Sequence, residues 1–392
     1  MRKMPIQNIL PGMKTACPVV TDGDSMLIGA GYVLTPKNIE RLVDMKLNWV
    51  MVDDPLTAGI EPTEPLRDSV RRDLQKKMTK LVDEVRKATP RPPESTWSDY
   101  CAQFRGQPLP AIAIELAEYI ALTAQREIEQ DSKKVIAYMP AASEELYLVD
   151  HALDVMCLSI MLAQAAGLTG KEIGELALGA LLHDVALFFL PVPEKHDGAS
   201  EGEFYDTGAL KEEHTTVGYD ILRKTPRVGI LSTIVAYQHH EYQDGRGFPQ
   251  GITGSNKILR GKELMQSKGI IHPYAEICAL VDTFVTLTSD SRNRIPLPFD
   301  KGLDMIMRLA GTRLNMELVR LFLGHAPRYP LGSEVIVQNG HYSGSRAIVA
   351  QISHYALNRP IVKLLEDESQ TRYVQEITID LEANPSVLVR GV

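Results

Sequence analysis

Seven side chains of metal-ligand type lie in one span of this sequence, and four of them form two adjacent pairs. They are His151, His183, Asp184, His214, His239, His240 and Asp282, which include five of the ten histidines of the chain. Neutral imidazole and carboxylate both bind divalent first-row metals. One metal needs about four protein donors, so seven donors are enough for two ions. Two ions about 3.5–4 Å apart form a clamp suited to phosphoryl chemistry.

Each histidine taken alone has a simpler interpretation. A single His on an amphipathic helix is more often a core or surface residue than a ligand. That interpretation does not account for Asp184, which lies in the almost wholly apolar stretch 177–190. A buried carboxylate is costly there unless it is paired or bound to a metal. We therefore expect the seven residues to form a metal site.

The residues around these donors predict helices that would hold them in place. His151, Val155, Leu158 and Leu162 follow helical spacing, so His151 is expected to face inward. The remaining donors are expected on a buried helix starting near Lys171 (His183, Asp184), at the start of another helix (His214), at the end of a helix from about Gly229 (His239, His240) and on an apolar helix (Asp282). Regular elements suit a preorganised site.

Two extended motifs around the donors resemble the HD-GYP domain, a branch of the HD phosphohydrolases. The HD pair corresponds to His183 and Asp184. The second signature, usually HHE-x-x-DG-x-GYP, is matched by HHEYQDGRGFP at residues 239–249, with Phe248 in place of the tyrosine. The resemblance covers about residues 105–325, where long spacings agree together with both motifs.

This resemblance implies a helical-bundle phosphodiesterase that hydrolyses cyclic di-GMP, a bacterial second messenger, to linear pGpG and often on to GMP. It also implies a di- or trinuclear centre, commonly of iron or manganese. By the same resemblance, one metal is held by His151, His183, Asp184 and Asp282, and a second is completed by His214, His239 and His240, with Asp184 as the bridge. A hydroxide shared by the metals would attack phosphorus, so no side-chain nucleophile is needed.

The resemblance further indicates where the dinucleotide would lie. The candidate contacts are Asp244, Gly245, Gly247 and Phe248 in the loop after the second histidine pair, and Arg292 and Arg294 after the helix of Asp282. Glycine lets a backbone approach a ligand closely. The two arginines are equally well explained as solvated loop residues. Arg246 and Lys262 are weaker candidates of the same kind.

Two departures from the family pattern alter the expected site. The family usually has HD-x-GK, whose lysine is assigned to substrate phosphate, whereas Ala186 and Leu187 stand at the last two positions here. One cation is therefore missing from the substrate side. Members with three metals have a glutamate one turn before the first histidine, and here that residue is Tyr147. We therefore expect two divalent ions, iron or manganese.

Composition limits the partners and the compartment. The chain has 392 residues, 44% of them hydrophobic, and a net charge of −8, which argues against a nucleic-acid polymer or an anionic membrane as partner. An anionic dinucleotide can still bind, because bound metals reverse the local field. The four cysteines show no pairing pattern, no apolar run of 18 residues occurs, and the N-terminal residues lack a signal-peptide core. These features predict a cytoplasmic protein without a membrane span.

The pattern of elements predicts a mainly α fold in four parts. Residues 1–58 form a small α+β module, with a helix starting at Thr35-Pro36 and a strand at 49–52, and residues 59–104 form a helical connector. The HD-GYP domain is expected at 105–328, followed by a β module at 329–392 with strands at 333–337, 346–352, 360–365 and 376–381. The connector helix either pairs with a second copy in a homodimer or packs on its own catalytic domain.

Three functions are compatible with these observations. The first is a metal-dependent cyclic di-GMP phosphodiesterase that yields pGpG, with slow further cleavage to GMP. The second is an inactive or weak HD-GYP scaffold that binds a nucleotide or a protein partner, which Leu187 and Phe248 favour. The third is a hydrolase of another cyclic dinucleotide. The complete set of seven donors favours catalysis, since a scaffold has less need of it.

Overall fold

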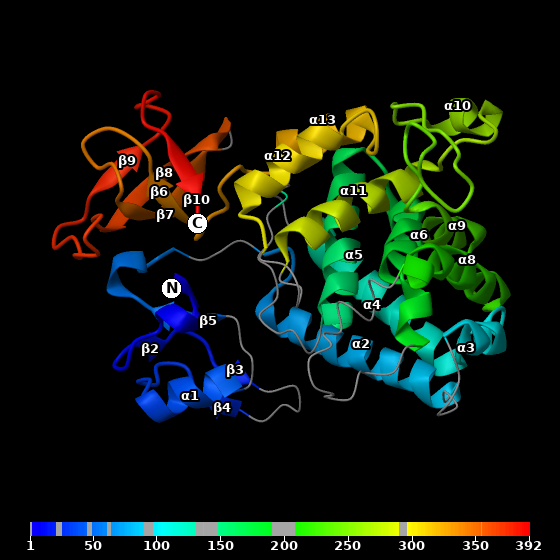
Figure 1. Ribbon diagram of the computed structural model, residues 1–392, viewed down its shortest axis with the longest axis horizontal. Helices are drawn as coiled ribbons and strands as arrows, with labels where there is room; N and C mark the ends of the chain where they lie inside the picture. Colours follow the sequence, from blue (N-terminus) through cyan, green and yellow to red (C-terminus); the bar gives the residue numbers. More distant parts are fainter. Residues whose placement is uncertain are drawn as a thin grey trace.

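The computed structural model is mainly helical, with two smaller β-containing modules beside a helical bundle (Figure 1). It describes residues 2–20, 26–44, 49–60, 64–89, 97–130, 136, 147–189, 208–289, 296–353 and 355–392. The bundle occupies the right of the view, and both modules lie on the left. The predicted fold class, a mainly α protein with small terminal modules, is confirmed.

The bundle is built around one buried helix, α5 (Tyr147–Ala165), which lies against α2, α4, α6, α11 and α13. The described helices of the bundle are α2 (Asp68–Ala88), α3 (Trp97–Phe104), α4 (Ala111–Gln130), α6 (Gly170–Leu181), η3 (Val185–Phe189), α8 (Gly208–Lys224), α9 (Ile230–Gln238), α10 (Gly261–Gln266), α11 (Pro273–Thr288), α12 (Phe299–Leu309) and α13 (Met316–His325). By length and composition α5 alone among the described helices could span a membrane, but 78% of its most apolar window is buried in this bundle.

Helix α2 packs against its own bundle, which is one of the two arrangements that the sequence allowed. Its buried apolar side chains follow helical spacing and belong to the main hydrophobic core; they are Leu74, Met78, Leu81, Val82 and Val85. They face α4 and α5. The helix therefore contributes directly to the packing around α5, which carries His151.

The N-terminal module has a small core of its own. Strands β1 (Arg2–Pro5), β5 (Trp49–Asp53) and β2 (Lys14–Thr15) form one antiparallel sheet, and β3 (Val19–Val20) pairs with β4 (Met26–Ile28). Helix α1 (Pro36–Asp44) begins at the predicted proline, and Thr35 Oγ1 accepts a hydrogen bond from Asn38 N at 3.3 Å. Leu42 on this helix is buried, whereas the neighbouring Val43 is 50% exposed.

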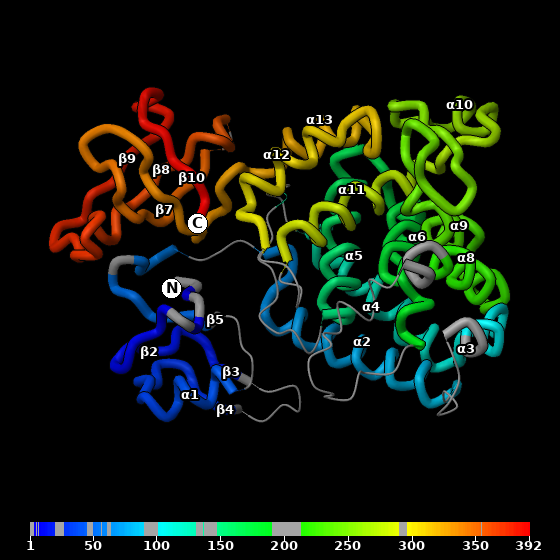
Figure 2. Tube along the Cα trace, viewed as in Figure 1, coloured from blue at the N-terminus to red at the C-terminus, as the bar shows by residue number. Residues whose placement is uncertain are grey.

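The C-terminal module is a five-stranded antiparallel sheet in the order β10-β6-β7-β8-β9. Its strands are β6 (Glu334–Val337), β7 (Arg346–Ser353), β8 (Ala356–Glu366), β9 (Thr378–Asp380) and β10 (Val389–Gly391). The first four overlap the predicted strands, whereas β10 was not predicted. One face of the sheet contacts Ile60, and Arg372 lies 3.3 Å from the buried carboxylate of Asp54. The first and last parts of the chain therefore meet on one side of the molecule, as Figure 2 shows.

Candidate metal centre

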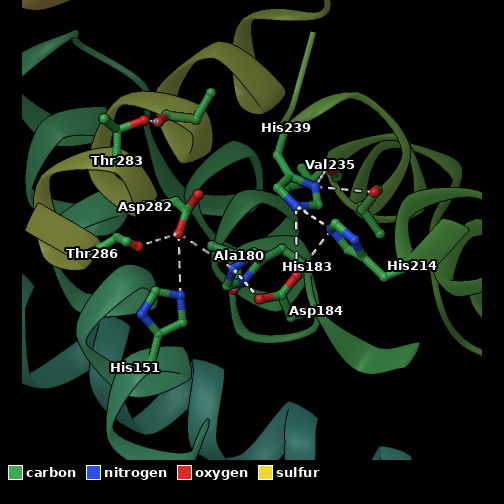
Figure 3. Close-up of polar contacts among 12 residues, drawn as sticks. His151, Ala180, His183, Asp184, His214, Val235, His239, Asp282, Thr283 and Thr286 are labelled. Carbon is green, nitrogen blue, oxygen red and sulfur yellow. Dashed lines mark hydrogen bonds and ion pairs between the residues drawn. The ribbon is translucent and has the colours of Figure 1, made fainter. Parts of the chain in front are cut away.

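The seven predicted donors come from five separate segments and lie together inside the bundle. Figure 3 labels all of them except His240. His151 is on α5, Asp282 is on α11, and His214 is on α8. His239 caps the C-terminal end of α9 and is followed by His240, as predicted. Among the described residues, every one of the seven belongs to at least one of three groups of potential ligands whose donor atoms lie within 4.8 Å of one another.

Two predicted placements are wrong. Helix α6 ends at Leu181, so His183 and Asp184 lie in the turn between α6 and η3 rather than on a helix. Successive side chains on a helix diverge by about 100°, whereas a turn allows both neighbours to point into one cluster. Helix α8 starts at Gly208, so His214 lies within the helix and not at its start. The intervening sequence ALKEE is rich in strong helix formers, which extends the helix toward its N-terminus.

Asp184 is the residue that reaches most of the histidines. Its Oδ2 lies 3.3 Å from His183 Nε2, and its Oδ1 lies 3.3 Å from His214 Nε2 and 3.6 Å from His239 Nε2. The two oxygens therefore face different histidines from three segments of the chain. A carboxylate in this position is suited to bridge two cations.

Asp282 organises the other end of the cluster. Its Oδ1 lies 3.1 Å from His151 Nε2 and 4.0 Å from His183 Nε2. The same oxygen accepts a hydrogen bond from Thr286 Oγ1 at 3.2 Å, one helical turn further along α11. Sequence reasoning did not identify Thr286, although its i+4 spacing from Asp282 is a signal that it could have used.

Backbone carbonyls orient two of the imidazoles. His183 Nδ1 lies 2.8 Å from the carbonyl oxygen of Ala180, and His239 Nδ1 lies 3.1 Å from that of Val235 and 3.0 Å from that of Ala236. When the imidazole is neutral, an Nδ1–H that donates to a carbonyl leaves the lone pair on Nε2, the nitrogen that faces Asp184 in both residues. This arrangement is typical of metal-binding histidines.

The polar atoms inside the cluster fit a bound cation. Within the described residues, His151 Nδ1 is fully buried and has no hydrogen-bond partner. Buried polar atoms are rarely left in this state unless an ion, a water or a catalytic role accounts for them. Burial alone would raise the pKa of Asp184 and Asp282, but hydrogen bonds and charge interactions with the histidines hold both pKa values below the usual range. Both carboxylates are therefore ionised and attract positive charge.

The loop after the second histidine pair folds back over the cluster. The Phe248 ring lies 4.8 Å from that of His240 and 6.3 Å from that of His214, measured between centroids. A Cβ on Gly247 would collide with the carbonyl oxygen of His240, and Gly245 has a φ of +76°, so both positions require glycine. Three of the four predicted loop contacts therefore lie in a segment that closely covers the histidines.

Of the remaining predicted substrate contacts, Asp244 is exposed at the start of the same loop, and two arginines lie outside the described part of the chain. Asp244 Oδ2 accepts hydrogen bonds from Arg246 at 2.6 and 2.9 Å, and these contacts lower the pKa of Asp244. The two side chains therefore satisfy each other at the surface. Arg292 and Arg294 fall outside the described residues.

Two positions where the chain departs from the family pattern lie next to the cluster. Tyr147, the first residue of α5, stacks on the His151 ring with a centroid distance of 5.5 Å. Leu187 is half-buried in η3, and its backbone N–H donates to the carbonyl oxygen of Asp184 at 2.8 Å. An aromatic ring and an aliphatic side chain thus stand where the resemblance placed a carboxylate and a lysine.

Comparison with known proteins places this region in a family. The model of the HD domain family matches residues 116–318. The chain is 28% identical over 176 residues to a cyclic di-GMP phosphodiesterase of Thermotoga maritima, covering 44% of this chain and 43% of the relative. It is 27% identical over 201 residues to the cyclic di-GMP phosphodiesterase PA4108 of Pseudomonas aeruginosa, covering 50% and 43%. The matches thus span less than half the length of these two relatives.

A solved structure also matches over much of the chain. It is that of Bd1817, an HDG"Y"P protein from Bdellovibrio bacteriovorus, with a TM-score of 0.41 and 16% sequence identity. The similarity extends over 82% of this chain and 97% of that one.

Proposed function

The chain belongs to the HD domain family, and on this premise we propose that it is a metal-dependent phosphodiesterase that hydrolyses cyclic di-GMP to linear pGpG. The observation that carries the proposal is the position of Asp184, whose two oxygens face three histidines from three segments. The names of the two relatives support cyclic di-GMP as the substrate. The chain matches 43% of the length of each of these relatives.

The donor set supports two divalent ions, iron or manganese. His151, His183 and Asp282 would hold one ion, His214, His239 and His240 would hold the other, and Asp184 would contribute to both. When bound, such ions lower the pKa of a coordinated water and neutralise charge on phosphoryl oxygens. Imidazole and carboxylate together suit iron and manganese, while the absence of cysteine from the set disfavours soft metals.

The residues of the chain would hold and align these groups. Thr286 and the carbonyls of Ala180, Val235 and Ala236 fix Asp282, His183 and His239, so that their donor atoms are aimed before any ligand arrives. Phe248 covers the outer histidines and offers an aromatic face to a base. Gly245 and Gly247 keep the loop backbone close to the cluster. Such prior alignment reduces the reorganisation needed for the reaction.

We further propose that pGpG accumulates and that cleavage to GMP is slow. The linear product has an extra terminal phosphate charge, which a side-chain cation would help to hold. Leu187 stands where the family resemblance expects that cation, and the substrate side is therefore one charge short. The first cleavage depends less on this charge, because the metal donors themselves are all present.

The decisive experiment combines metal analysis with turnover on one anaerobically purified sample. The expected result is about two ions per chain and conversion of cyclic di-GMP to pGpG. Chromatography of samples taken at successive times would measure this conversion. Immediate appearance of GMP without pGpG would contradict the argument from Leu187. Metal-replete protein that consumes no cyclic di-GMP would refute the proposed activity, and a panel of other cyclic dinucleotides would then test for a different substrate.

A further inference from the structure

A buried carboxylate outside the metal cluster joins the loop over the histidines to the bundle. Glu276 lies on α11, and only 4% of its surface is exposed. Its Oε1 accepts a hydrogen bond from Gln243 Nε2 at 2.6 Å, and its Oε2 accepts one from Asn315 Nδ2 at 2.9 Å. Both of these partners are neutral amides, so within the described residues the buried carboxyl group is held by hydrogen bonds from uncharged donors.

The direction of both hydrogen bonds is determined by other contacts of the two amides. Gln243 Oε1 accepts from the backbone N–H of Asn256 at 2.9 Å, which turns Gln243 Nε2 toward Glu276. Asn315 Oδ1 accepts from the N–H groups of Glu317 and Leu318 at the start of α13, which turns Asn315 Nδ2 toward Glu276. Each oxygen of Glu276 therefore faces a donor and must act as an acceptor.

The two amides joined by Glu276 hold the two ends of one loop, residues 243–257, although Asn315 itself lies outside it, at the start of α13. Gln243 is the first residue of this loop, and Asn315 Nδ2 also donates to the carbonyl oxygen of Lys257, the last, at 3.1 Å. A Cβ on Gly254 would collide with the Gln243 side chain, so the two ends are closely packed. Phe248 lies within this loop, against the ring of His240.

We propose that Glu276 is a positioning residue that fixes the loop 243–257, and with it Phe248, over the metal cluster. It touches neither the donor set nor the proposed position of the dinucleotide, and it acts through Gln243 and Asn315. The effect on substrate depends on the proposed phosphodiesterase activity, whereas the effect on the loop does not. Without the hydrogen bonds to Glu276, the loop would cover the cluster only part of the time. Substrate affinity would therefore fall more than the rate of the chemical step.

The substitution Glu276→Gln tests this role with little change of volume. One accepting oxygen becomes an NH₂ group that faces a donor, so one of the two hydrogen bonds is lost. We expect faster amide hydrogen exchange in residues 243–257, easier tryptic cleavage after the exposed Arg246, and unchanged metal content. With cyclic di-GMP we expect KM to rise about tenfold, the equivalent of one hydrogen bond to a charged group, and kcat to change less. Glu263→Gln on α10, where the side chain is exposed, is the control.

An exchange of the two side chains provides a rescue that a merely structural role would not predict. In the double variant Gln243→Glu/Glu276→Gln, the carboxylate at 243 accepts from Asn256 N and from the new amide at 276. That amide in turn accepts from Asn315, so every donor again has an acceptor. Gln243→Glu alone places two carboxylates face to face. We expect each single variant to loosen the loop and the double variant to restore both loop protection and KM.

Hydrogen exchange and kinetics are measured at pH 8. Burial raises the pKa of Glu276 to about 7, so its carboxyl group is mainly ionised at this pH. Unchanged exchange in residues 243–257 of Glu276→Gln would overturn the proposal, as would a loosened loop with unchanged KM or a loss of metal. Absence of turnover by the unaltered protein, together with a loosened loop in the variant, would refute the phosphodiesterase activity and leave the loop assignment intact. If Glu276→Gln does not fold, Gln243→Met removes the loop-side partner and gives the same test.

Discussion

Two sets of carboxylates lie on opposite sides of helix α5, and their negative charge is neutralised in different ways. On the side facing α2, Asp154 Oδ1 lies 2.7 Å from Arg71 Nη2 and Asp150 Oδ1 lies 3.7 Å from it. Asp150 Oδ1 also accepts a hydrogen bond from Gln75 Nε2 at 2.6 Å. On the other side, the ion-pair contacts described for Asp184 and Asp282 are all to histidines.

The difference lies in where the positive charge comes from. Burial alone would lower the pKa of Arg71, but Asp154 and Asp150 raise it above its usual value, so this guanidinium is a permanent cation. Imidazoles are neutral when they act as metal ligands, so the second set relies on cations from solution. At the structural site the positive charge thus belongs to a side chain, Arg71. At the site where chemistry is proposed, the positive charge would come from metal ions that can exchange with solution.

The largest expected effect comes from removing the shared carboxylate. Asp184→Ala should lose most of the bound metal and reduce turnover by more than the roughly 10–100-fold that an outer-shell partner costs. Metal content and cyclic di-GMP hydrolysis, measured on one preparation, check this. Asp73→Ala, which changes a half-exposed aspartate on α2, should retain both. Full metal content in Asp184→Ala would show that Asp184 does not link the two ions.

Removing the permanent cation should instead affect folding. Arg71→Met leaves Asp150 and Asp154 buried without a positive charge, which is expected to cost about 3–5 kcal/mol of the free energy of unfolding. Chemical denaturation of the variant and of the unaltered protein measures this difference. Arg72→Met, at an exposed position one residue further, should change stability by less than about 0.5 kcal/mol. Equal stabilities of the two variants would mean that the Arg71 charge is not needed.

Glu276 extends the comparison to a carboxylate whose hydrogen-bond partners in the described part of the chain are two neutral amides. Burial, opposed by the hydrogen bonds from Gln243 and Asn315, raises the pKa of Glu276 from 4.5 to about 7. The folded chain therefore holds this proton more tightly than the unfolded chain does. Stability is expected to fall by about 3 kcal/mol between pH 4.5 and 7 on account of this group, and to be independent of it above that range.

Comparison of pH-dependent unfolding in Glu276→Gln and in the unaltered protein isolates this contribution. The variant has no titrating group at 276, so its loss of stability across this interval should be smaller by that amount. Parallel curves would show that the pKa of Glu276 is not raised in the folded chain.

The smallest expected effect comes from adding a chain-borne cation to the metal side. Leu187→Lys should lower KM for cyclic di-GMP roughly ten- to a hundredfold, because a charge-assisted contact to phosphate contributes about 1.5–3 kcal/mol. Leu187 is half-buried, which leaves a route for a lysine to reach solvent. Steady-state kinetics and thermal unfolding together separate a binding effect from a folding effect. Unchanged kinetics in a stable variant would mean that position 187 does not face substrate.

The sequence predicted the donor set better than the local structure that presents it. The adjacent pairs and an aspartate in an apolar stretch were sufficient signals, because such residues are rarely buried together without a purpose. The turn at His183 and Asp184 was not predicted, since the apolar stretch 177–190 continues through it without a glycine or proline after Gly179. The end of α6 is therefore not visible as a local signal.

Glu276 is the clearest example of a contact that the sequence pattern does not predict. Its neighbours in sequence indicate an ordinary position on an apolar helix, and its hydrogen-bond partners lie 33 and 39 residues away. Likewise, Arg71 meets Asp154 across 83 residues. Only the packing of α2, α11 and α13 brings these groups together, and no short-range pattern determines that packing.

The sequence by itself therefore determined the mainly α character, the positions of β5 and of four strands of the C-terminal sheet, and seven candidate metal ligands that lie together in the fold, because these depend on local periodicity and residue chemistry. The tertiary structure decided which histidines face Asp184, which cation neutralises Asp150 and Asp154, and how the loop 243–257 is held over the cluster. These are contacts between segments far apart in the chain, and they depend on how burial, charge and hydrogen bonding are satisfied together in one folded core.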